Sequence, residues 1–231
     1  MNKNEVAMKS EIEKSLITLL KGVQHFDNEV FVEHKELFEK LASSQSPSTL
    51  FITCSDSRIN PSMITQTEPG ELFIVRNVGN IVPPYGEMLG GVSSAIEYAV
   101  LALKVQHVVV CGHSNCGAMN ALCDLSSPKF DTMPTVRRWL RNAEAARATL
   151  GPLEAKDMGP ETVRELAEQN VLLQLAHLRT HPAVVGALSR GELALQGWFY
   201  EIGTGQIVIL DEQTRKMRSV DEALAELHAE A

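Results

Sequence analysis

The stretch Thr49-Leu50-Phe51-Ile52-Thr53-Cys54-Ser55-Asp56-Ser57-Arg58 joins an apolar run to a group of reactive side chains. Its first five residues are apolar or β-branched, which is typical of a buried strand. Cys54, Asp56 and Arg58 therefore lie where the strand ends and a loop begins, and open α/β sheets bind their ligands at such ends. A thiol, a carboxylate and a guanidinium this close change one another's protonation. The stretch predicts a reactive site.

A second run, Val108-Val109-Val110-Cys111-Gly112-His113-Ser114-Asn115-Cys116-Gly117, has the same design. Its valines predict a buried strand, and Gly112 gives the backbone the freedom to turn. His113 and Cys116 follow at the start of a helix. Zinc accepts thiolates and imidazole together in a tetrahedron, and three protein ligands leave the fourth position for water. Cys54, His113 and Cys116 are therefore candidate ligands of a catalytic zinc ion. The alternative is that the cysteines are core residues and that His113 caps a turn.

Length and composition favour a soluble protein of a reducing compartment, such as the cytoplasm. The 231 residues, 44% of them hydrophobic, suffice for one large domain with a sizeable core. Four cysteines without the spacing of small secreted domains argue against a disulfide scaffold. The longest early apolar run, residues 16–20, is too short for a signal core or a membrane span. The net charge of -8 disfavours nucleic-acid binding, so neither a membrane nor nucleic acid is an expected partner.

The order of apolar segments predicts an α/β fold with a parallel β-sheet core flanked by helices, an N-terminal helical arm and a C-terminal hairpin extension. Two arm helices, Glu11–Val23 and Asn28–Ala42, carry apolar residues at helical spacing but no core of their own, so the arm packs on the domain or on another subunit. Strands are expected at 49–53, 71–75, 107–111 and 195–202, and helices at 91–103, 114–125, 135–150, 161–179 and 183–188. This alternation favours a parallel sheet covered on both faces.

The chain end predicts a hairpin of segments 199–202 and 206–210, because Gly203-Thr204-Gly205 separates them. A polar edge and a final amphipathic helix are expected after Asp211. No glycine pattern of a nucleotide-binding loop follows a strand. We expect one domain over residues 1–231, composed of the arm at 1–45 and the α/β core with its C-terminal extension at 46–231.

Asp56 and Arg58 complete the chemistry expected of the metal centre. Two thiolates neutralise a dication, so the metal acidifies its water less than it would with three neutral imidazoles. Asp56 can accept a hydrogen bond from zinc-bound water or hydroxide, and Arg58 can hold that carboxylate ionised and aimed. The alternative is a surface ion pair of little consequence. The resulting hydroxide suits a small electrophilic carbon, such as that of carbon dioxide or a relative.

Three runs, 54–58, Arg76-Asn77-Val78-Gly79-Asn80 and 112–117, together resemble those of the β-class carbonic anhydrases. The likeness extends from about Phe31 to Tyr200 and is greatest to the bacterial cyanate-operon and plant chloroplast types. It implies a parallel core, a homodimer as the minimal active unit, often assembled into higher even oligomers, and reversible hydration of carbon dioxide to bicarbonate.

The resemblance also implies roles for individual residues. It makes Cys54, His113 and Cys116 the ligands of one zinc ion per chain, with Asp56 and Arg58 as the dyad that orients the attacking water. It further implies five substrate-binding residues: Gln45 from across the dimer, Phe73 and Tyr98 as aromatics of a narrow apolar pocket, and Val78 and Gly117 as small groups beside the bound water.

One departure from the family concerns the state of Asp56. Some bacterial relatives carry a tryptophan three residues before the first cysteine, where it helps to bind a bicarbonate that lets the aspartate move onto zinc and close the site. This chain has Phe51 there and lacks the indole donor. We therefore expect an open site with Asp56 paired to Arg58, and Asp56 as a zinc ligand only in a closed state.

Two other functions stay open at the level of sequence. Asp56 could fill the fourth zinc position permanently, in which case the protein is a catalytically silent, zinc-stapled scaffold. The same centre could instead hydrolyse carbon disulfide or carbonyl sulfide. Cys111 and Cys123 are expected to be core residues, and His107, His177 and His181 lack a spacing that suggests a second metal site.

Overall fold

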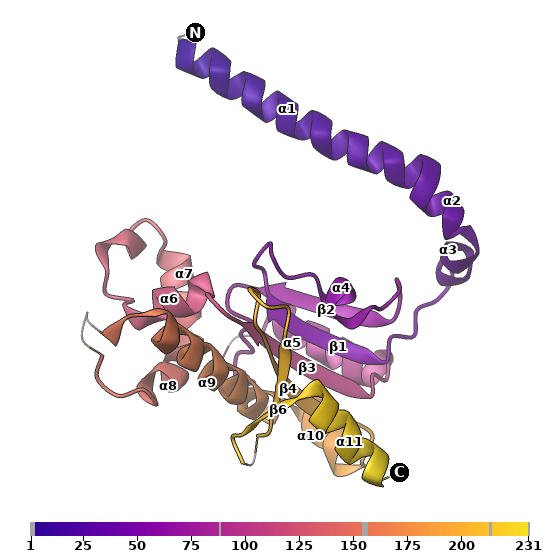
Figure 1. The fold of residues 1–231 in the computed structure, drawn as a ribbon. Coiled ribbons are helices and arrows are strands. Elements are labelled where there is room, and N and C mark those ends of the chain that lie inside the picture. Colours follow the sequence, from indigo (N-terminus) through magenta and orange to yellow (C-terminus); the bar gives the residue numbers. More distant parts are fainter. Residues whose placement is uncertain (1–2, 88, 154–156, 213, 231) are drawn as a thin grey trace. The chain divides into compact units, whose positions relative to one another are not determined.

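The computed structural model describes residues 3–87, 89–153, 157–212 and 214–230. By its internal contacts the chain divides into two compact units, Met1–Gln45 and Ser46–Ala231. The first unit consists of α1 (Lys3–His25), the π-helical turn η1 (Phe26–Val30), α2 (Phe31–Glu33) and α3 (Lys35–Leu41) (Figure 1). The first arm helix thus begins earlier than predicted, and the second is interrupted at His34, whose backbone leaves helical geometry.

Helix α1 exposes an apolar stripe. Its members recur at helical spacing and each is more than half exposed: Ile12, Leu16, Leu19, Leu20 and Val23. At the other end of this unit Phe26, Phe31 and Phe38 pack together, the rings of Phe31 and Phe38 being stacked with their centroids 5.3 Å apart. A single aromatic cluster therefore orders the turn after α1, whereas the stripe presents apolar surface to solvent.

A six-stranded sheet in the order β2-β1-β3-β4-β5-β6 forms the centre of the second unit. The four strands that pair in parallel are β1 (Thr49–Cys54), β2 (Leu72–Asn77), β3 (His107–His113) and β4 (Ala194–Tyr200). Strands β5 (Ile207–Leu210) and β6 (Met217–Ser219) add in antiparallel fashion. The predicted α/β fold with a parallel core and a C-terminal hairpin is confirmed, and β6 is a strand where only a polar edge was expected.

The helices of this unit follow the predicted order, but several predicted helices are divided into shorter segments. They are α4 (Pro61–Thr65), α5 (Gly91–Glu97), η2 (Tyr98–Ala102), α6 (Gly117–Cys123), η3 (Pro128–Phe130), α7 (Pro134–Leu140), η4 (Arg141–Ala143), α8 (Glu144–Ala148), α9 (Pro160–Leu178), α10 (Pro182–Ser189) and α11 (Val220–Glu230). Helix α6 begins three residues later than predicted because Asn115 adopts a positive φ of 51°, which a helix cannot contain.

The two faces of the sheet are covered to different extents. Leu50 and Ile52 of β1 are fully buried in a large cluster that includes residues of α9 and α10, whereas Phe51 lies in a small cluster on the opposite face. Helix α9 packs closely, since a Cβ at Gly112 would lie 2.8 Å from Val171 Cγ2. On the Phe51 face, α4 and α11 border a hollow of about 650 Å³. Among the described helices, none has both the length and the apolar character to cross a lipid bilayer.

Candidate active site

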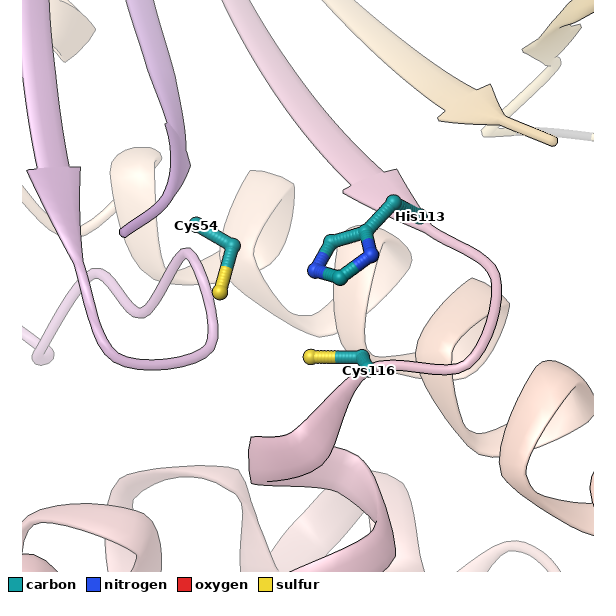
Figure 2. A group of neighbouring side chains, drawn as sticks. All are labelled: Cys54, His113 and Cys116. Atoms are coloured by element: carbon teal, nitrogen blue, oxygen red, sulfur yellow. The ribbon is translucent and has the colours of Figure 1, made fainter. Parts of the chain in front are cut away.

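Two strand ends bring the three predicted ligands together. Cys54 is the last residue of β1, His113 is the last residue of β3, and Cys116 precedes α6. These strands are parallel neighbours, so their carboxyl ends lie at the same edge of the sheet. Both sulfurs and a nitrogen of the His113 ring lie within 4.8 Å of one another, and all three residues are buried. Figure 2 shows the two thiol groups and the imidazole pointing toward a common centre.

The imidazole of His113 is held by its own loop. Its Nδ1 lies 2.9 Å from the carbonyl oxygen of Ser114, which requires a proton on Nδ1 and leaves the lone pair on Nε2. Nε2 is buried and has no hydrogen-bond partner among the described residues. Ser114 is fixed in turn, because its N–H donates to Tyr200 O and its hydroxyl accepts from the N–H of Ile202, both at 3.0 Å. The C-terminal hairpin thereby orients a nitrogen that a metal ion would satisfy.

The two thiols influence each other's protonation. Hydrogen bonding with Cys116 lowers the pKa of Cys54, and His113 and the N–H of Gly79, at 3.4 Å from Cys54 Sγ, lower it further against the effect of burial. The pKa of Cys116 is raised by the same hydrogen bond and by burial. Without a cation, the pair therefore keeps one proton, which stays on Cys116. A cation bound between the two sulfurs would replace this proton. Two sulfurs and one imidazole nitrogen fit a zinc ion.

Asp56 lies beside this group and is paired with Arg58. Arg58 Nε donates to Asp56 Oδ1 at 2.9 Å, Arg58 Nη2 donates to Asp56 Oδ2 at 2.8 Å, and the Arg58 N–H adds a bond of 3.0 Å to Oδ1. Hydrogen bonding from Arg58 holds the pKa of the Asp56 carboxyl well below its usual range. Arg58 also donates to Asn115 O at 3.1 Å. The carboxylate is therefore ionised, and its partner is tied to the loop that carries His113 and Cys116.

The end of β2 and the turn after it pack against the end of β1 and the loop that carries Asp56. Arg76 donates to the carbonyl oxygens of Cys54 and Asp56 at 3.1 and 2.6 Å. The side chain of Asn77 bonds both the N–H and the carbonyl of Ile81, at 2.7 and 2.9 Å, and closes the loop. The run 76–80, which sequence comparison identified as a motif, thus acts as a support for the site.

The predicted substrate residues fall into two separate places. Val78 and Gly117 border one hollow of about 280 Å³. Phe73 and Tyr98, whose ring centroids are 5.9 Å apart, border another of about 520 Å³. Phe73 pairs with Leu50, four residues before Cys54 along β1, which corresponds to about 13 Å. Within one chain, the aromatic pair therefore lies apart from Cys54, His113 and Cys116, the candidate metal-binding group.

Gln45 and the remaining cysteines are also located. Gln45 is exposed and belongs to the unit 1–45, and its role stays a prediction. Cys111 and Cys123 are buried, which confirms their expected position in the core. Burial raises the pKa of Cys111 to about 12, so this thiol stays protonated.

Several polar residues that support the site were missed by sequence reasoning. Asn170 and Gln174 of α9 are fully buried, His177 Nδ1 lies 2.7 Å from Val82 O, and His181 Nε2 lies 3.0 Å from Pro83 O. The indole N–H of Trp139 donates to Val78 O at 2.8 Å. A signal did exist: polar residues recur at positions 170, 174 and 177 on the face of α9 that otherwise packs into the core.

Comparison with known proteins identifies the class of this enzyme. Residues 49–207 match the family model for carbonic anhydrase, and the chain belongs to this family. It is 47% identical over 206 residues to the carbonic anhydrase of Pseudomonas aeruginosa, with 88% of this chain and 91% of that protein aligned.

Solved structures place the chain in the β class. The β-carbonic anhydrase CcaA superimposes with a TM-score of 0.84 at 41% identity, covering 89% of this chain and 92% of that one. The tetrameric β-carbonic anhydrases of Sordaria macrospora give a TM-score of 0.74 at 30% identity, covering 85% and 97%. The β-class carbonic anhydrase expected from the sequence is thus confirmed, and with it carbonic anhydrase activity.

Proposed function

We propose that this carbonic anhydrase depends on one zinc ion per chain, held by Cys54, His113 and Cys116, and converts carbon dioxide reversibly to bicarbonate and a proton. One observation carries the proposal: ligand atoms of three buried residues lie within 4.8 Å of one another, and the nearby Asp56 carboxylate is held by two hydrogen bonds from the Arg58 guanidinium. Nε2 of His113, which has no hydrogen-bond partner in the described part of the chain, supports a cation at their centre.

When bound, zinc would lower the pKa of a water molecule and so supply hydroxide near neutral pH. Asp56 would accept a hydrogen bond from the hydroxide and orient its oxygen toward the carbon of carbon dioxide. Arg58 keeps Asp56 ionised. Its bond to Asn115 O also fixes the position of Asp56 relative to the loop between His113 and Cys116. A bond from the hydroxide oxygen to the carbon, with opening of one C=O bond, would give bicarbonate, and the proton that the water loses would pass to solvent.

The walls of the site suit a gas without charge. Val78 directly follows β2 and Gly117 directly follows Cys116, and both border one hollow. We assign these two side chains to the space beside the nucleophile. Carbon dioxide gains mainly from leaving water, so an apolar surface is a sufficient binding site.

We infer that a second copy of the chain completes each site. Phe73 and Tyr98 lie together but apart from the metal-binding group of their own chain, so their proposed role in the substrate pocket requires a neighbouring subunit. Gln45 is assigned in the same way to the site of the partner. A homodimer, or a higher even oligomer such as the tetramer formed by the Sordaria macrospora relatives, fits this arrangement.

The pairing of Asp56 with Arg58 favours the enzymatic centre over a zinc-stapled scaffold. A scaffold needs a fourth protein ligand, whereas the metal-capable group found among the described residues contains Cys54, His113 and Cys116 without Asp56. We also propose a cytoplasmic location, because cysteines that are free or bind metal, and do not form disulfides, are typical of reducing compartments.

The test combines metal analysis with a rapid indicator assay of carbon dioxide hydration. We expect about one zinc per chain and rapid acidification that chelation abolishes. Cys54→Ser should lose both zinc and hydration, whereas Cys123→Ser, which changes a cysteine outside the metal-binding group, should keep both. Protein that is isolated without zinc and stays inactive after zinc is added would contradict the proposal; bound zinc without hydration would support the scaffold.

A further inference from the structure

The peptide between Val78 and Gly79 is held at both ends next to the metal-binding group. Its N–H, that of Gly79, donates to Cys54 Sγ at 3.4 Å. Its carbonyl, that of Val78, accepts the indole N–H of Trp139 at 2.8 Å. A rotation of this peptide would move the donor away from the sulfur, so Trp139 opposes that rotation from the far side.

The next peptide is held by a buried relay from α9. Asn170 Nδ2 donates to Gly79 O at 2.9 Å, Gln174 Nε2 donates to Asn170 Oδ1 at 2.7 Å, and Gln174 Oε1 accepts the N–H of Val82 at 2.8 Å. Asn170 and Gln174 are fully buried, and each bond in the relay determines which way the next amide points. The relay therefore fixes the Gly79 carbonyl from inside the core.

Gly79 itself has little freedom between these contacts. Its φ is +85°, and a Cβ would lie 3.0 Å from Ala118 Cβ and 3.1 Å from Met119 Cε. With the carbonyl of Gly79 held by Asn170 and the preceding carbonyl held by Trp139, the direction of the Gly79 N–H is determined.

We propose that Trp139 and Asn170, the latter with Gln174, are positioning residues that hold the Gly79 N–H on the sulfur of Cys54 and thereby set the strength of this sulfur as a metal ligand. A hydrogen bond to a thiolate stabilises its charge and orients its lone pairs, and such outer contacts tune a metal site as its direct ligands do. This proposal rests on the proposed zinc site and identifies residues that determine how strongly Cys54 binds the metal.

Two variants test the proposal. Trp139→Phe removes the indole donor and keeps an aromatic ring, and Asn170→Leu removes the amide at a similar shape. Each should weaken zinc affinity about ten- to hundredfold, as is usual for outer contacts of a metal site, measured by competition with a chelator. In the cobalt-substituted protein each should also move the thiolate-to-metal charge-transfer band to longer wavelength, because sulfur electrons rise in energy without the N–H donor.

Matched controls separate positioning from packing. Trp198→Phe makes the same exchange at an indole nitrogen that lacks a hydrogen-bond partner among the described residues. Gln169→Leu removes an amide in the same way at the preceding position of α9, where the side-chain oxygen Oε1 has no hydrogen-bond partner among the described residues. Both should bind zinc as the wild type does and leave the cobalt band in place.

The outcomes decide between explanations. A folded Trp139→Phe protein with wild-type zinc affinity, or with an unmoved cobalt band, overturns the positioning role. Should Asn170→Leu fail to fold, Trp139→Phe decides alone, since Trp139 is partly exposed. Wild-type protein that binds no zinc contradicts the proposed function instead, so the two failures are distinguishable.

Discussion

Arg58 binds both carboxylate oxygens of Asp56, through Nε at 2.9 Å and Nη2 at 2.8 Å. Such a two-point contact fixes the plane of the carboxylate as well as its charge. Both residues come from the loop after β1, and Arg58 reaches across to Asn115 O in the loop after β3. The pair therefore links the loops next to Cys54 and to Cys116, two of the side chains that could hold a metal ion.

Replacing Asp56 by Asn should keep zinc and lose most turnover. The amide has nearly the same shape but presents a donor where the nucleophile needs an acceptor, and we expect hydration to fall about 10²- to 10⁴-fold. Stopped-flow hydration rates and zinc content check this, with Asp221→Asn on exposed α11 as a control that should behave as the wild type. Near-normal turnover of Asp56→Asn would remove the dyad from the mechanism.

Replacing Arg58 by Ala should slow hydration about ten- to hundredfold with zinc retained. Without its partner the Asp56 carboxylate is free to approach the metal and occupy the position of the nucleophile. A crystal structure of the zinc-loaded variant should then show an Asp56 oxygen at about 2.0 to 2.2 Å from the metal, whereas the wild type should not. The same short distance in the wild type at neutral pH would contradict the open site.

Co-expression of two inactive chains tests whether sites are shared. Cys54→Ser lacks a metal ligand and Tyr98→Ala lacks an aromatic of the pocket. If Tyr98 serves the partner, each mixed dimer contains one complete site, and random pairing should restore about a quarter of wild-type activity. If Tyr98 serves its own chain, the mixture will show no more than the average of the separate variants.

Acid should destabilise the protein through two histidines. Burial lowers the pKa of His177 and of His181, so both stay neutral in the folded state and bond the carbonyls of Val82 and Pro83. The unfolded chain takes up their protons below about pH 6.5, so this stability is complete above that pH and falls as the pH drops toward the lowered values.

Urea unfolding at pH 7.5 and 5.5 measures this effect. The loss of stability on acidification should be smaller in His177→Gln and His181→Gln than in the wild type, because each variant has one fewer group to protonate. His228→Gln, at an exposed position in α11, should lose as much as the wild type. Equal losses in all four proteins would show that other groups control the acid response.

Local patterns in the sequence were enough to predict the fold class and the proximity of three side chains that could hold a metal ion. Apolar runs of strand length, alternating with helical periodicity, define a parallel sheet, and Cys54, His113 and Cys116 follow two of these runs directly. Because the carboxyl ends of neighbouring parallel strands meet at one edge, their proximity follows from local sequence once the fold is known.

Only the tertiary structure determined which residues hold the site in place and which predicted site residues lie apart from one another. The contacts of Asn170 with Gly79 and of Trp139 with Val78 join segments distant in sequence, and the separation of Phe73 from the metal-binding group depends on strand register. Such relationships depend on how elements pack against one another, and hydrophobic periodicity specifies which face of an element is buried but not what it contacts.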